Sequence, residues 1–160
     1  MRWPKLQANG TKYSFSNERE MAKNKLRAAL TICAYNDIHS VVIGDFGLGN
    51  SYRNPPQEMA ELWREVFLWD TNLRGRIENV AFVFEDATQS TMRLILEDAA
   101  KKSKGSTSSS KGKGKSSSSS SGMPGCPVDM DIFQHVFNAA EIHRVASQGD
   151  PRMGLGNLMS

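Results

Sequence analysis

The chain of 160 residues has few cysteines and histidines and no long hydrophobic segment. Its two cysteines, Cys33 and Cys126, cannot form the set of disulfides that holds many small secreted domains together. No apolar run approaches the ~20 residues of a membrane-spanning helix, and residues 1–6 lack the apolar core of a signal peptide. We therefore expect an intracellular protein, cytoplasmic or nuclear, that does not bind a membrane.

Acidic residues are absent from residues 101–122, which consist almost entirely of Ser, Lys and Gly and carry six lysines. Without those lysines the formal net charge of +3 becomes −3, so the rest of the chain is mildly acidic and direct DNA binding is not expected. A segment of this composition cannot bury enough apolar area to offset the entropy of ordering it. We expect a low-complexity, disordered insertion at residues 104–125 and a flexible tail at residues 149–160.

Hydrophobic spacing predicts an α/β protein. Asn17 is predicted to cap the first helix together with Glu20, three residues later. The expected order is a helix at 17–36, a strand at 41–46, a helix at 55–69, a strand at 79–84, and helices at 91–102 and 131–146. A strand, a helix and a second strand with short connections predict a parallel pair with a right-handed crossover.

A glycine turn follows the first strand, whose apolar residues predict cover on both faces. Gly44, Gly47 and Gly49 allow sharp turns and close approach of a ligand to the backbone. Asn54 is predicted to cap the next helix, with Pro55 in its first turn and Gln57 completing a capping box. Such a turn directs free N–H groups at one point, which suits a phosphate, but glycine turns also occur where only packing requires them.

Other motifs are excluded. Tyr52 replaces the third glycine of a Rossmann fingerprint, and Asp45-Phe46-Gly47 lacks the remaining kinase motifs. His135 and His143 are not spaced as metal ligands, so no metal site or cofactor is expected.

The predicted sheet has only two strands, whereas a stable α/β domain usually needs more. An exposed edge of this hydrophobicity would promote aggregation. The sequence therefore predicts that an N-terminal half is missing or that another chain completes the sheet.

The segments VVIGDFGLGNSYRNPPQEMAELWREV and NVAFVFED, with Asn17-Glu-Arg-Glu-Met21 before them, resemble the C-terminal half of microbial-type poly(ADP-ribose) glycohydrolases, which are macrodomains. The resemblance is to the fungal branch, which also has a Ser-rich insertion, and covers residues 2–148 outside that insertion. It implies a three-layer α/β/α fold that binds ADP-ribose at the carboxyl end of the sheet. Residues 1–103 would form the C-terminal half of this domain and residues 126–148 its final helical segment.

The resemblance also implies a ligand-binding loop. Backbone N–H groups of Gly47, Leu48 and Gly49 would hold the diphosphate, Tyr52 would lie near the distal ribose, and Asn54 would cap the helix rather than touch the ligand. The implied ligand-binding residues are Gly44, Asp45, Gly47, Leu48, Gly49, Asn50, Ser51 and Tyr52.

Two departures from the family pattern concern catalysis. Leu48 replaces the usual cysteine, which backbone binding would tolerate. The upstream glycine-rich loop and Gln-Glu-Glu, whose second glutamate is the general acid in the family, have no counterpart, and Gln57-Glu58 lacks the glycine loop before it. Met1 thus falls inside the expected domain, and no catalytic residue is assigned.

Three interpretations stay open. The first is a truncated macrodomain that binds ADP-ribose or poly(ADP-ribose) without hydrolysing it. The second is a functional enzyme, either completed by a separate N-terminal half-domain or truncated only in the gene model. The third is a non-catalytic protein that binds ADP-ribose or another nucleotide diphosphate.

Overall fold

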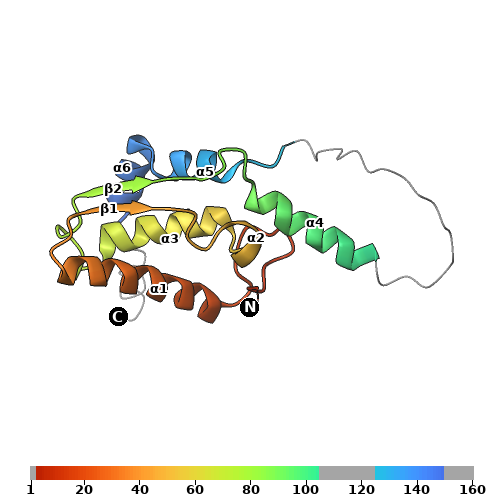
Figure 1. The fold of residues 1–160 in the computed structure, drawn as a ribbon, viewed down its shortest axis with the longest axis horizontal. Helices are drawn as coiled ribbons and strands as arrows, with labels where there is room; N and C mark the ends of the chain where they lie inside the picture. Colours follow the sequence, from red (N-terminus) through yellow and green to blue (C-terminus); the bar gives the residue numbers. More distant parts are fainter. Residues whose placement is uncertain (1–2, 105–124, 150–160) are drawn as a thin grey trace, which may run out of the picture.

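The computed structural model describes residues 3–104 and 125–149, so most of the expected insertion and tail lies outside the described residues. The described part is a mixed α/β structure with a small parallel sheet (Figure 1). Its elements are α1 (Ser16–Tyr35), β1 (Ser40–Ile43), α2 (Gly49–Tyr52), α3 (Pro56–Trp69), β2 (Asn79–Phe82), α4 (Thr91–Lys104), α5 (Asp129–Val136) and α6 (Ala139–Ser147).

The two strands pair in parallel, as predicted, with α3 in the crossover between them. The register runs from Ser40 opposite Asn79 to Ile43 opposite Phe82. Both strands end earlier than predicted. After Ile43 the backbone leaves the ladder in tight turns, since the N–H of Phe46 donates to the carbonyl of Gly44 at 2.6 Å.

The sheet is covered on one face only, so the prediction of cover on both faces is wrong. Ile43 is buried, but Val42, which points to the other face, is 73 % exposed, and Val83 is 52 % exposed. The α3–α5 pair packs against the inner face through aromatic side chains of both helices. In Figure 1, α3 runs between the sheet and α1. None of the described helices covers Val42, which explains its exposure.

An aromatic cluster joins α3, β2 and α5. The ring of Trp63 lies 5.7 Å from that of Phe67 and 6.0 Å from that of Phe82. Phe82 in turn lies 5.0 Å from Phe133 and 4.8 Å from Phe137. Such offset and edge-to-face pairs add to the stabilisation from buried area. Residues on both sides of positions 105–124 therefore share one hydrophobic core.

Helix α1 has the predicted apolar stripe, with Leu26 and Leu30 fully buried. The predicted capping box is wrong. The helix begins at Ser16 after Phe15, and no side chain caps it. Glu18, in the first turn, instead accepts a hydrogen bond from the N–H of Lys5 at 2.9 Å, which ties the N-terminal segment to the helix.

The final helical segment is two helices rather than the one predicted. Helix α5 ends at Val136, and α6 starts after Asn138, whose Oδ1 accepts a hydrogen bond from the N–H of Ala140 at 2.9 Å. An Asn side chain competes in this way with continued helical hydrogen bonding. The break lets Phe137 stay against the core while α6 takes a new direction.

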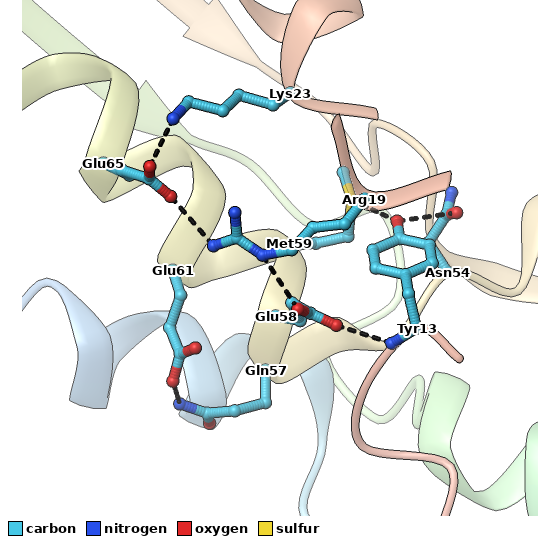
Figure 2. A network of polar contacts seen from close by, with 9 residues as sticks. All are labelled: Tyr13, Arg19, Lys23, Asn54, Gln57, Glu58, Met59, Glu61 and Glu65. Atoms are coloured by element: carbon cyan, nitrogen blue, oxygen red, sulfur yellow. Dashed lines mark hydrogen bonds and ion pairs between the residues drawn. The ribbon is translucent and has the colours of Figure 1, made fainter. Parts of the chain in front are cut away.

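A cluster of charged residues joins α1 to α3 (Figure 2). Lys23 forms an ion pair with Glu65, and Arg19 bridges Glu65 at 2.8 Å and Glu58 at 3.0 Å. Burial alone would raise the pKa of Glu65, but hydrogen bonds from Lys23 and Arg19 outweigh it and hold the pKa below its ordinary value. Glu58 also accepts a hydrogen bond from the N–H of Tyr13 at 2.7 Å, which brings the N-terminal segment to α3.

Candidate functional site

The glycine turn uses its glycines where the backbone requires them. Gly47 and Gly49 have φ values of +79° and +72°, in the left-handed region that favours glycine. A Cβ atom on Gly47 would lie 2.9 Å from Nδ2 of Asn54, and one on Gly49 would lie 3.0 Å from Oε1 of Gln89. Both positions therefore favour glycine by conformation, and a Cβ there would also press on a neighbouring side chain.

Asn54 does not cap α3, contrary to the prediction. Pro55 is the N-cap residue and Pro56 starts the helix. The Asn54 amide donates to the carbonyl of Gly47 at 2.7 Å and accepts from the hydroxyl of Tyr13 at 2.9 Å. It thus cross-links the glycine turn to the N-terminal segment, and Figure 2 shows the contact with Tyr13. The capping box at Gln57 is also wrong, because this amide donates to Glu61 at 2.8 Å.

Two of the three backbone amides expected to hold a diphosphate have acceptors within the protein. The N–H of Leu48 donates to the carbonyl of Asp45 at 3.0 Å, and that of Gly49 donates to the hydroxyl of Thr91 at 2.7 Å. The amides of Leu48 and Gly49 are therefore not free to hold a diphosphate. The N–H groups of Asn50 and Ser51 lie in the first turn of α2, where no earlier helical carbonyl is available to accept them.

A cavity of about 500 Å³ lies beside the turn, between the N-terminal segment and the start of α1. Of the predicted ligand-binding residues, Asp45, Gly47 and Tyr52 line it, and Phe46 lies between the first two. The other five, Gly44, Leu48, Gly49, Asn50 and Ser51, are not among its lining residues. Glu18, Met21, Ala22 and Lys25 of α1 form the opposite wall.

Trp3 adds an aromatic wall that sequence reasoning missed. Its Nε1–H donates to the carbonyl of Ser51 at 3.2 Å, and its ring lies 4.3 Å from the guanidinium carbon of Arg53. Arg53 is itself held by Asp98 and by the carbonyl of Leu94 at 2.9 Å. No pattern in residues 1–16 singles out Trp3. Its position depends on Arg53, which is fifty residues away in the sequence and has a left-handed backbone conformation.

Asp45 is the acidic group at the turn. Burial raises the pKa of its carboxyl above the ordinary value, a hydrogen bond from the backbone of Glu85 opposes this, and the negative charges of Asp129, Glu85 and Asp86 add to it. Its Oδ1 is buried and accepts no hydrogen bond from any described residue. A buried acceptor without a donor favours a ligand that supplies one, such as a hydroxyl or an amino group.

Glu58 lies outside the cavity wall and is 6 % exposed. Both of its carboxylate oxygens are engaged, one by Tyr13 and one by Arg19. Its environment is that of a structural group rather than a catalytic acid.

Within residues 3–104 and 125–149, no three His, Cys, Asp or Glu side chains are grouped so that they could hold a metal ion. No helix in the same residues is long and apolar enough to cross a membrane. Comparison of the chain with protein-family models, with curated proteins and with solved structures gave no match.

Proposed function

We propose that this protein binds ADP-ribose, free or at the end of poly(ADP-ribose), in the cavity beside the glycine turn. The observation that supports this most is a cavity of about 500 Å³ beside the turn, lined by four aromatic side chains, Trp3, Tyr13, Phe46 and Tyr52. Ligand sites for small molecules have this size and combine apolar walls with a few polar groups. The turn follows β1, at the carboxyl end where ligands of α/β sheets bind.

Each part of the ligand has a suitable partner in this proposal. The indole of Trp3 offers a flat face for the adenine base, and Asp45 accepts a hydrogen bond from a ribose hydroxyl or the base amine. The ammonium group of Lys25, in the cavity wall, attracts the diphosphate. The resemblance of residues 41–66 and 79–86 to macrodomains supports the same ligand class.

We propose that the chain alone does not hydrolyse the glycosidic bond. Hydrolysis requires a positioned acid and a second carboxylate on opposite sides of the reacting sugar. The described carboxylates in the cavity wall are Asp45 and Glu18. Glu18 already accepts a hydrogen bond from the N–H of Lys5. Neither stands in the sequence pattern that carries the acid in glycohydrolases.

A second candidate function is half of a hydrolase that another polypeptide completes. The uncovered sheet face at Val42 and Val83 favours it, because a full three-layer α/β/α macrodomain has helices on both faces of its sheet.

Calorimetric titration and thermal unfolding with ADP-ribose test the proposed binding. At a ligand concentration of about one hundred times Kd, binding adds about 2.7 kcal/mol of stability, which raises Tm by about 5–10 °C in a domain of this size. Trp3→Ala should weaken binding, and Val42→Thr on the open face should leave it unchanged. No heat of binding and no shift of Tm would refute the proposal. Release of ADP-ribose from the polymer would refute the absence of hydrolysis.

A further inference from the structure

A buried hydrogen-bond relay connects the glycine turn to the start of α5. Thr91 and Asp129 are both 0 % exposed. The hydroxyl of Thr91 donates to Oδ2 of Asp129 at 2.6 Å, and the N–H of Thr91 donates to Oδ1 at 2.9 Å. The amide of Gln89 completes the set of donors to Oδ2 at 3.0 Å. The carboxylate thus has three hydrogen-bond donors and no contact with solvent.

The relay reaches the turn through Gly49. The Thr91 hydroxyl donates its one hydrogen bond to Asp129, so the lone pairs of its oxygen are free to accept another. The N–H of Gly49 donates to this oxygen at 2.7 Å. Gly49 is the first residue of α2, so this bond fixes where that helix begins. Gln89 also packs 3.0 Å from the position that a Cβ of Gly49 would occupy. Gly49 stands in the chain between Gly47 and Tyr52, which line the cavity, so its placement helps to set theirs.

Two helix ends stabilise the buried carboxylate. Asp129 lies in the first turn of α5. Its carboxylate accepts a hydrogen bond from the N–H of Thr91, which is the first residue of α4. The positive ends of helix dipoles favour a negative charge there. The N–H of Asp129 donates to the carbonyl of Gln89 at 2.8 Å, and the hydroxyl of Ser90 donates to the carbonyl of Pro127 at 2.8 Å. The two segments that flank positions 105–124 are thus joined on either side of the carboxylate.

We infer that Thr91 and Asp129 are positioning residues of the nucleotide site: they hold Gly49, and with it the turn through which Gly47 and Tyr52 reach the cavity wall. The inference rests on the proposed function for its ligand. Neither residue lines the cavity, so both act through Gly49. The affinity for ADP-ribose therefore depends on a residue that follows the Ser/Lys/Gly segment in the sequence.

Replacement of the Thr91 hydroxyl tests the relay. Thr91→Val keeps the shape of the side chain but leaves the Gly49 amide without its acceptor, whereas Thr91→Ser keeps the hydroxyl. Thr88→Val is the matched control, since Thr88 is exposed and its hydroxyl bonds only to Asp86 among the described residues. The readouts are the proton chemical shift and exchange rate of the Gly49 amide by NMR and the Kd for ADP-ribose by calorimetry.

We expect Thr91→Val to speed exchange at Gly49 and to weaken ADP-ribose binding about tenfold, as for the loss of one buried hydrogen bond. Thr91→Ser should restore both properties, even if its missing methyl group lowers stability, and Thr88→Val should change neither. Should Thr91→Val fail to fold, Asp129→Asn, which removes the charge but keeps the shape, is expected to act in the same direction.

The outcomes separate this inference from the proposed function. Altered exchange at Gly49 with unchanged affinity in Thr91→Val would overturn the positioning role and leave ADP-ribose binding intact. Equal exchange at Gly49 in the valine and serine variants would overturn the relay itself. A wild-type chain that binds no ADP-ribose would refute the proposed function, while exchange at Gly49 would still decide whether the relay exists.

Discussion

Replacing Glu65 by leucine should destabilise the protein strongly, because it leaves the charge of Lys23 buried without its partner. The Lys23 side chain is only 6 % exposed and that of Glu65 10 %, whereas Arg19 is 34 % exposed and keeps its second partner, Glu58. Loss of one member of a buried ion pair costs about 3–5 kcal/mol. The partial exposure of Arg19 places the expectation at the lower end, about 3 kcal/mol.

Urea unfolding followed by circular dichroism measures this loss, and thermal unfolding should show Tm lower by about 6–12 °C. The double variant Lys23→Met with Glu65→Leu is the control, because replacing both members of a buried pair by apolar side chains is often close to neutral. A single variant that loses less than about 1 kcal/mol, or a double variant as unstable as the single one, would contradict the reasoning.

The pH dependence of stability offers a second readout of the same contact. Since the pKa of Glu65 in the folded protein lies below its ordinary value of 4.5, the stabilisation is fully present above about pH 4.5. It is lost as the pH falls through the lower, folded-state pKa. Wild-type stability should therefore fall more steeply than that of Glu65→Leu in this acid range.

Three further predictions concern the turn, helix α1 and the sheet. Gly47→Val should destabilise the protein by about 1–3 kcal/mol in urea unfolding, because the backbone is left-handed there and a Cβ would meet Asn54; wild-type stability would contradict this. In the same assay Leu26→Ala should lower the free energy of unfolding by about 2–5 kcal/mol, because the Leu26 side chain is 0 % exposed. Val42→Thr should lower it by less than about 0.5 kcal/mol, because Val42 is 73 % exposed. Asp45→Asn should raise the free energy of unfolding at pH 7, because burial raises the pKa of Asp45 and its ionised form therefore destabilises the folded state. The gain should disappear below about pH 4, where the carboxyl is protonated in both states. Equal effects at both pH values would count against this reasoning.

The elements that depend on hydrophobic periodicity were predictable from the sequence. Helix α3 has a continuous stripe through Met59, Leu62 and Val66, all of them buried, and the parallel pairing of the strands follows from its place between them. The exposure of Val42 was not predictable, because an apolar strand looks the same whether or not a second layer covers it.

The candidate site was predictable only in part. Glycines at positions 47 and 49 indicated a tight turn, and both have positive φ. The role of Asn54 was misjudged because its position before two prolines fits a helix cap, while its partners, Gly47 and Tyr13, depend on tertiary structure. The Thr91–Asp129 pair spans 38 positions, and neither residue belongs to a motif that would connect them.

The aromatic cluster of α3, β2 and α5 also bears on how the protein is made. On a ribosome that adds about 5–20 residues per second, Trp63 and Phe82 emerge several seconds before Phe133 and Phe137. During that interval the nascent chain exposes an aggregation-prone apolar surface, which Phe133 and Phe137 cover only later. The soluble yield of this protein in cells should therefore depend on the availability of chaperones during translation.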